Sequence, residues 1–120
     1  MIDRPTVHRQ IGENEATLRA ADSYLRSTAS KMWDAAVNRG QVELAIRAEI
    51  RMASTYAIRQ AVQVVDAAYE ICGASAIFKR NPVQRRYQDI HVIVQQFQGR
   101  PTNFETAGRY YLGLDTIGSL

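Results

Sequence analysis

Apolar side chains recur at steps of mostly three and four residues through the first forty positions of the chain, which is the period of one face of an α-helix. The members of this face are Ile11, Leu18, Ala21, Leu25, Ala29, Met32 and Ala36. Pro5 suits the first turn of such a helix, with Asp3 before it as a cap, and the string 38–40 (Asn-Arg-Gly) is a stop signal. We therefore predict one helix of about thirty residues.

A second run of apolar positions follows at the same period. It comprises Ile46, Ile50, Ala53, Ala57, Ala61, Val64, Ala68 and Ile71. The later half is apolar on another side as well, through Val62, Val65, Tyr69 and Cys72. A helix that is apolar around most of its girth is buried on more than one side. The two long helices form an antiparallel hairpin, and the remaining elements or another subunit must cover the second side.

Two shorter helices are expected in the last third of the chain. Pro82 stands at a first helical position with Asn81 as its cap, and the apolar face runs through Val83, Tyr87, Ile90, Val94 and Phe97. Thr102 and Glu105 have the spacing of a capping box before a last helix that carries Phe104, Ala107, Tyr110, Tyr111 and Leu114. No alternation of period two persists. We predict one all-α domain over residues 1–120, a four-helix up-down bundle with two long helices and two shorter ones.

Composition places the chain among ordinary soluble domains. The 120 residues are 46% hydrophobic and 22% charged, and the net charge of +3 is a mild excess. A solvated mixed-charge surface explains that excess better than a nucleic-acid footprint does, so nucleic acid is an unlikely partner. The single cysteine, Cys72, rules out an internal disulfide and favours the cytoplasm. No apolar run reaches the ~18 residues of a membrane span.

Several classes of active site lack their residues here. His8 and His91 are the only histidines and no second ligand accompanies either at metal-binding spacing, so no metal site is expected. Nothing resembles a nucleophile elbow or a phosphate-binding loop of the Walker or dinucleotide type. Asp66 and Glu70 lie four apart, and a partly buried Asp66 more often pairs with an arginine of a neighbouring helix than performs catalysis.

The densest charge in the chain is the basic cluster Lys79, Arg80, Arg85 and Arg86, beside the small-residue stretch 73–76. Two interpretations stay open. The cluster is a solvated corner with one structural pair between arginine and Asp89, or it contacts a phosphate or pyrophosphate, because arginines near a helix start and a glycine loop complement an anion.

Three strings in this region, 67–75 (AAYEICGAS), 81–85 (NPVQR) and 89–91 (DIH), resemble the C-terminal domain of the acyl-CoA dehydrogenase superfamily. The strings 12–16, 18–21 and 33–36 resemble the first helix of that domain. The similarity covers nearly the whole chain, and its order and spacing agree. It is greatest to the branch that holds flavin-dependent monooxygenases beside dehydrogenase-like proteins of uncharacterised substrate.

The resemblance implies a four-helix bundle that packs against an N-terminal helical domain and a β domain, both missing from these 120 residues. It also implies a homo-oligomer, dimer or tetramer, which would cover the second apolar side of the long helix. In the family the loop that matches 72–75 lies near the flavin of a neighbouring subunit. The implied cofactor is FAD or FMN, and the implied cofactor-binding residues are Gly73, Ala74, Ser75 and Arg85.

Departures from the family pattern bear on catalysis. Phe97 stands where dehydrogenases of the family place a catalytic glutamate, and Gln96 stands where hydroxylases place a histidine. Neither side chain can take up a proton as a base. Gln88 replaces the arginine before Asp89, and His91, one turn away, is better explained as a structural histidine. We therefore expect no catalytic residue in this chain.

The predicted function is support of flavin binding and oligomer assembly, as the C-terminal helical domain of a flavin-dependent oxidoreductase of acyl-CoA dehydrogenase type. The alternative is a stand-alone, non-enzymatic helical oligomerisation module. The substrate, the choice between dehydrogenation and hydroxylation, and the choice between FAD and FMN stay open.

Overall fold

The computed structural model describes residues 4–73, 82–116 and 120. Its helices are α1 (Pro5–Arg39), α2 (Leu44–Cys72), α3 (Pro82–Ile93) and α4 (Thr102–Tyr111), with a short 3₁₀ helix η2 (Phe97–Gly99) before α4. No strand occurs in these residues. The prediction of an all-α bundle with two long and two shorter helices is confirmed.

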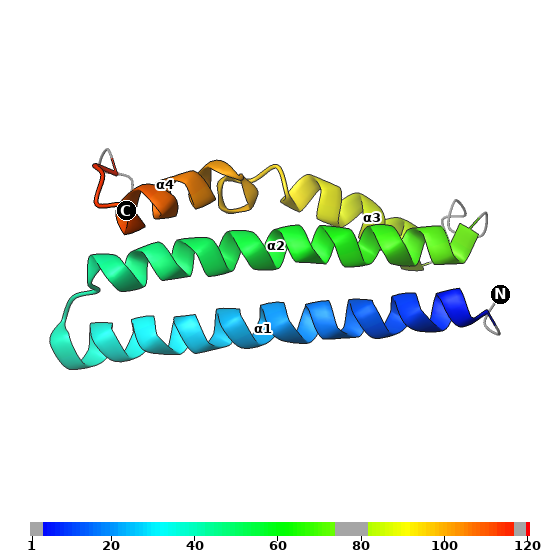
Figure 1. Cartoon of the computed structure of the whole chain (residues 1–120), viewed down its shortest axis with the longest axis horizontal. Coiled ribbons are helices and arrows are strands. Elements are labelled where there is room, and N and C mark those ends of the chain that lie inside the picture. Colours follow the sequence, from blue (N-terminus) through cyan, green and yellow to red (C-terminus); the bar gives the residue numbers. More distant parts are fainter. Residues whose placement is uncertain (1–3, 74–81, 117–119) are drawn as a thin grey trace.

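α2 is the central element of the bundle. It runs antiparallel to α1 on one side, and on the other side α3, η2 and α4 follow one another along its length as a third arm (Figure 1). The turn between the long helices is closed by Gly40, whose φ of 71° lies in the left-handed region and whose N–H donates to the Ala36 carbonyl. This central position accounts for the two apolar sides of α2.

The buried residues of α1 form a narrow strip that follows a seven-residue period. Val7, Ala21, Thr28 and Ala35 are buried at multiples of seven, the period of a coiled-coil seam. The predicted face is wrong in part, because the Ile11 and Leu18 side chains are 55% and 42% exposed. α1 packs mainly on α2, and one partner helix covers only one strip of its surface.

Polar contacts fix the register of the α1–α2 seam. The Thr28 hydroxyl donates to the Tyr24 carbonyl at 2.8 Å and approaches the Glu49 carboxylate at 3.3 Å. The Lys31 ammonium lies 3.0 Å from the same carboxylate. The rings of Tyr24 and Tyr56 meet edge to face, with centroids 6.3 Å apart. Because Glu49 belongs to α2 and its partners to α1, sliding of either helix would break this group.

α3 packs on the C-terminal half of α2 through aromatic rings and one hydrogen bond between side chains. Tyr87 lies between Tyr69 and His91, at centroid distances of 4.2 and 4.5 Å. The His91 Nε2 is 2.7 Å from the Asp66 Oδ1. The expectation that Asp66 pairs with an arginine was wrong, since α3 brings a histidine to that position. His91 has the structural contact that was expected of it.

Four predicted helix ends need comment. α3 ends at Ile93, so the predicted face does not continue to Phe97, which belongs to η2. The capping box at Thr102 was wrong, because Pro101 (φ −59°, ψ −22°) already has helical angles and no side-chain cap forms. The predicted caps Asp3 and Asn81 lie outside the described residues.

The seam generates a prediction about alkaline pH. Burial raises the pKa of the Tyr24 hydroxyl above 10.0, Glu49 and Tyr111 add to the rise, and Lys31 opposes it. A raised pKa means that the folded state holds this proton more tightly than the unfolded state. The resulting stabilisation is complete below pH of about 10 and is lost as pH rises through the folded-state pKa.

We therefore expect Tyr24→Phe to lose less stability than the wild type as pH rises above about 10. Urea unfolding at a series of pH values measures the difference. Tyr87→Phe, which keeps its ring between Tyr69 and His91, is the control and should follow the wild type. Identical pH dependence of Tyr24→Phe and the wild type would show that the seam does not hold this proton.

Candidate functional site

The chain leaves α3 and returns to α2 through residues 94–101, which we name the crossing segment. Successive turns close it: the Val94 N–H donates to the Ile90 carbonyl, and the Gly99 N–H donates to the Gln96 carbonyl. The segment contains η2, and its Gly99 is buried while Gln96, Phe97 and Gln98 are exposed. The carbonyls of Gln96 and Phe97 accept N–H groups within the segment, and side chains from α2 and α4 supply further donors to it.

The side chains of α2 include a donor stripe, formed by Arg51, Thr55 and Arg59, which lie four residues apart and so share one face. The Thr55 hydroxyl donates to the Gln98 carbonyl at 2.6 Å. The Arg59 guanidinium donates to the Gly99 carbonyl at 2.8 Å. Both donors sit beneath the crossing segment and hold it against α2.

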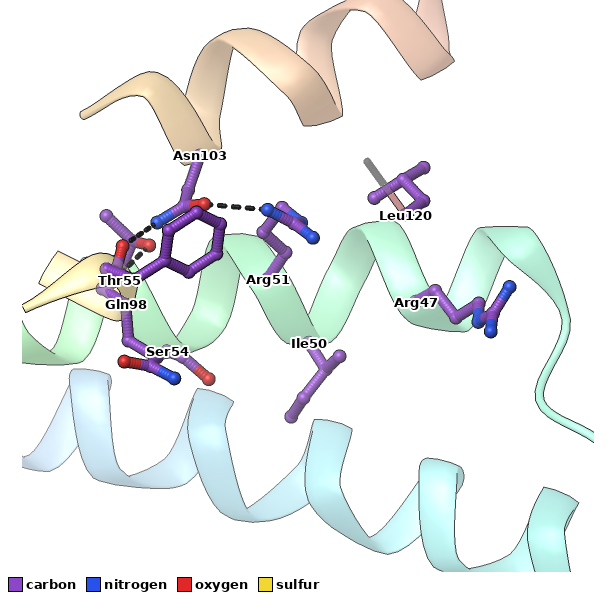
Figure 2. A pocket seen from close by; sticks show the side chains of 9 residues that line it. Arg47, Ile50, Arg51, Ser54, Thr55, Gln98, Asn103 and Leu120 are labelled. Carbon is purple, nitrogen blue, oxygen red and sulfur yellow. Dashed lines mark hydrogen bonds between the residues drawn. The ribbon is translucent and has the colours of Figure 1, made fainter. Parts of the chain in front are cut away.

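Asn103, buried in the first turn of α4, completes the arrangement (Figure 2). Its side-chain amide donates to the Phe97 carbonyl at 2.6 Å, and its oxygen accepts from the Arg51 guanidinium at 2.8 Å. The same guanidinium lies 5.4 Å from the centroid of the Phe97 ring. The carbonyls of residues 97, 98 and 99 thus each accept a hydrogen bond from a side chain.

Gly99 has a steric reason to be glycine. A Cβ atom built on it would lie 2.6 Å from the Val94 carbonyl oxygen, which is backbone and has little freedom to move. The close approach lets the crossing segment fold back on the end of α3. It also aims the Gly99 carbonyl at Arg59.

A pocket of about 300 Å³ opens beside the crossing segment. It is lined by Arg47, Ile50, Arg51, Ser54, Thr55, Phe97, Gln98, Asn103 and Leu120. α2 supplies the floor, and the crossing segment and α4 supply the opposite wall (Figure 2). The volume is at the lower end of the range for small-molecule sites.

The residues predicted to bind a cofactor lie at the other end of α2. Gly73 closes α2 with φ 60° and ψ −139°, a conformation that favours glycine, and its N–H already donates to the Glu70 and Tyr69 carbonyls. Arg85 is exposed on α3, 4.0 Å from the Asp89 carboxylate. Ala74 and Ser75, together with Lys79 and Arg80, lie outside the described residues.

The pocket and the Gly73 turn are therefore separate places. Ser54 and Gly73 are nineteen residues apart along α2, which at 1.5 Å per residue is about 28 Å. Gln96 and Phe97, two of the three positions at which the resemblance implies a departure from the family pattern, belong to the crossing segment, and Phe97 forms part of the pocket wall.

Neither a metal site nor a membrane-spanning helix is found in the described part of the chain. No group of three or more His, Cys, Asp or Glu side chains comes close enough there to hold a metal ion. Within the same residues, no helix has both the length and the apolar character needed to cross a bilayer.

Comparison with known proteins agrees with the helical architecture and with the strings noted in the sequence. Residues 1–100 match the family model described as acyl-CoA dehydrogenase, C-terminal domain. The chain belongs to this family. The predicted resemblance is thereby confirmed.

Relatives within the family carry oxygenase and hydroxylase names. A pigment production hydroxylase of Rhodococcus erythropolis is 32% identical over 119 residues, 98% of this chain and 30% of the relative. An indole-3-acetate monooxygenase of Pseudomonas putida is 27% identical over 114 residues, 94% of this chain and 29% of the relative. An indole-3-acetate monooxygenase of Acinetobacter baumannii is 26% identical over 115 residues. The chain spans less than a third of the length of these relatives.

The donor stripe and the pocket were missed by sequence reasoning. A signal was present, because three hydrogen-bond donors at positions 51, 55 and 59 recur at four-residue steps and so lie on one face of the helix. The acceptors could not be identified from the sequence, because they are backbone carbonyls, which every residue has.

The steric role of Gly99 gives a direct test. Gly99→Ala should destabilise the fold by about 2 kcal/mol, because a backbone atom stands where the new methyl must go. Gly12→Ala is the matched control: it lies inside α1 with nothing within 4 Å, so it should stabilise by about 0.5–1 kcal/mol. Denaturant unfolding measures both. Equal effects of the two substitutions would contradict the proposed close approach.

The hydroxyl of Thr55 gives a second test. Thr55→Val keeps the side-chain shape but removes the bond to the Gln98 carbonyl, so we expect a loss of about 1–3 kcal/mol. Thr17→Val removes a hydroxyl that bonds only within α1, at an exposed position, and should change stability by less than about 0.5 kcal/mol. Hydrogen exchange of the 97–99 amides should accelerate in Thr55→Val. Unchanged exchange there would remove Thr55 from the set of anchors.

Proposed function

We propose that this chain is the C-terminal helical domain of a flavin-dependent oxidoreductase of acyl-CoA dehydrogenase type, and that it supports flavin binding and oligomer assembly in the cytoplasm. The observation that carries the proposal is the family match over residues 1–100, joined to relatives named as monooxygenases and a hydroxylase. The single cysteine suits a reducing compartment.

The turn at Gly73 fits a supporting role toward FAD or FMN. Gly73 has no side chain to obstruct a flat or phosphorylated group, and its N–H is engaged within α2, so it contributes space rather than a hydrogen bond. Arg85 contributes an exposed guanidinium that is only loosely paired with Asp89. Ala74 and Ser75 complete the proposed binding residues. A bound flavin would supply the redox chemistry, which no side chain of this domain provides.

Assembly has its own support in the exposed apolar side chains. Trp33 and Val37, four residues apart on α1, are 71% and 63% exposed, and Leu44 at the start of α2 is 52% exposed. Large apolar side chains that gather on one end of a hairpin are typical of a surface that another protein part covers. We assign this end to contacts with other subunits or domains, in a dimer or tetramer.

We assign catalysis to parts of the oxidoreductase outside these 120 residues. Gln96 and Phe97 occupy the positions that carry an acid or base in the family, and neither can exchange a proton at neutral pH. His91 is already paired with Asp66 and packed against Tyr87.

Flavin occupancy of the full-length oxidoreductase tests the proposal. Gly73→Val should lower flavin content and weaken rebinding of flavin to the apoprotein at least tenfold, about 1.4 kcal/mol. Gly40→Val is the matched control, because Gly40 also ends a long helix with positive φ but at the opposite end of α2. Absorbance of flavin per protein and titration of the apoprotein give the two readouts.

Arg85→Gln should weaken flavin binding, whereas Arg26→Gln should not, although Arg26 has a comparable exposed pair with Asp22. Equal flavin content in the Gly73 and Gly40 variants would remove the turn from the cofactor site. A colourless, stable oligomer with no affinity for FAD or FMN would favour the alternative, a non-enzymatic oligomerisation module.

A further inference from the structure

The pocket beside the crossing segment contains two polar groups that the fold does not use. The Arg47 guanidinium makes no ion pair with any described residue, and the Ser54 hydroxyl has no hydrogen-bond partner among them. They lie seven residues apart on one face of α2, about 10 Å along the helix axis. Arg51, between them, is occupied by Asn103 and the Phe97 ring.

The charges around the pocket are unbalanced. No acidic side chain lines it. Glu43, one turn before Arg47, is paired with Arg39, and Glu49 points to the α1 side, where it meets Lys31 and Thr28. The side chains that line the pocket therefore carry only positive charge, and a carboxylate-sized anion is the group complementary to them.

The rest of the pocket is apolar. Ile50 of α2 and Phe97 of the crossing segment both line the pocket, and Phe97 is 55% exposed. A pyrophosphate or a nucleic-acid backbone would leave these side chains without a matching surface. A volume of about 300 Å³ suits a ligand of roughly ten to fifteen heavy atoms.

We propose that this pocket binds a small organic monoanion whose carboxylate pairs with Arg47 and whose apolar body lies between Ile50 and Phe97. The anchors of the crossing segment pre-form the site, because Thr55, Arg59 and Asn103 fix the wall that carries Phe97. The inference does not depend on the proposed flavin role, since the Gly73 turn lies at the other end of α2.

The test is a titration of the isotope-labelled 120-residue chain with 3-phenylpropionate, followed by amide chemical shifts. This probe has a carboxylate and an aromatic body, the two features that the lining residues Arg47 and Phe97 would contact. We expect the amide chemical shifts of residues 47–55 and 97–98 to change saturably, with a dissociation constant in the millimolar range. The uncharged 3-phenylpropionamide should bind at least tenfold more weakly. Arg47→Gln should weaken 3-phenylpropionate binding at least tenfold, and Phe97→Ala several-fold.

Arg19→Gln is the control, because Arg19 is exposed on α1 and paired with Glu15. It should bind the probe as the wild type does. Arg47 is itself exposed, so its variant should fold, and matching amide spectra would show that it has. Absence of saturable shifts would overturn the proposal, as would equal binding of the amide or equal binding by the two arginine variants. Because no flavin is present, failure here leaves the flavin test unaffected.

Discussion

The bundle depends on the capture of three peptide carbonyls by side chains. The crossing segment presents the carbonyls of residues 97, 98 and 99 to α2 and α4, and Asn103, Thr55 and Arg59 bond them in that order. α3 and α4 have 12 and 10 residues, and helices of that length are marginal without tertiary support. α3 has its own contacts with α2 through Tyr87 and His91, but without these bonds the segment between α3 and α4 would lose its attachment to α2, and the pocket would lose one of its walls.

Helix ends marked by proline or glycine could be predicted from the sequence, whereas the end of α3 and the cap of α4 could not, and the buried surfaces could be predicted only in part. Pro5, Gly40, Gly73 and Pro82 punctuate the chain, and each marks a helix end in the structure. The wider apolar stripe of α1 was assumed to face a core. Instead α1 has one main neighbour, and its exposed Ile11 and Leu18 belong to a surface that no described residue covers.

Part of the candidate site could likewise be proposed from the sequence, and part of it could not. Gly73 and Arg85 were predicted because the resemblance pointed to them, and their place in a cofactor site stays a prediction. Gly73 forms a turn without a side chain, and Arg85 is exposed, 4.0 Å from the Asp89 carboxylate. The pocket could not be found, since it is made from two segments about fifty residues apart and from backbone carbonyls. Its most informative residue, Arg47, looks in sequence like any solvated arginine on a helix. Arg47 becomes distinctive only in the structure, where the neighbouring Glu43 and Glu49 pair with other residues.

The composition of the core gives a physical reason for a domain of this kind to have neighbours. The buried apolar residues among those described are Val7 and five alanines (Ala21, Ala35, Ala48, Ala53 and Ala107). Alanine contributes little to the hydrophobic effect because it removes little area from water, at about 25 cal/mol per Å². Larger side chains such as Trp33, Val37 and Leu112 remain mostly exposed. The small residues let the helices approach closely. Most of the large apolar side chains that could still be removed from water lie on the outer surface. Covering that surface would stabilise the bundle more than any rearrangement inside it, which is why assembly belongs in the proposed function beside the cofactor.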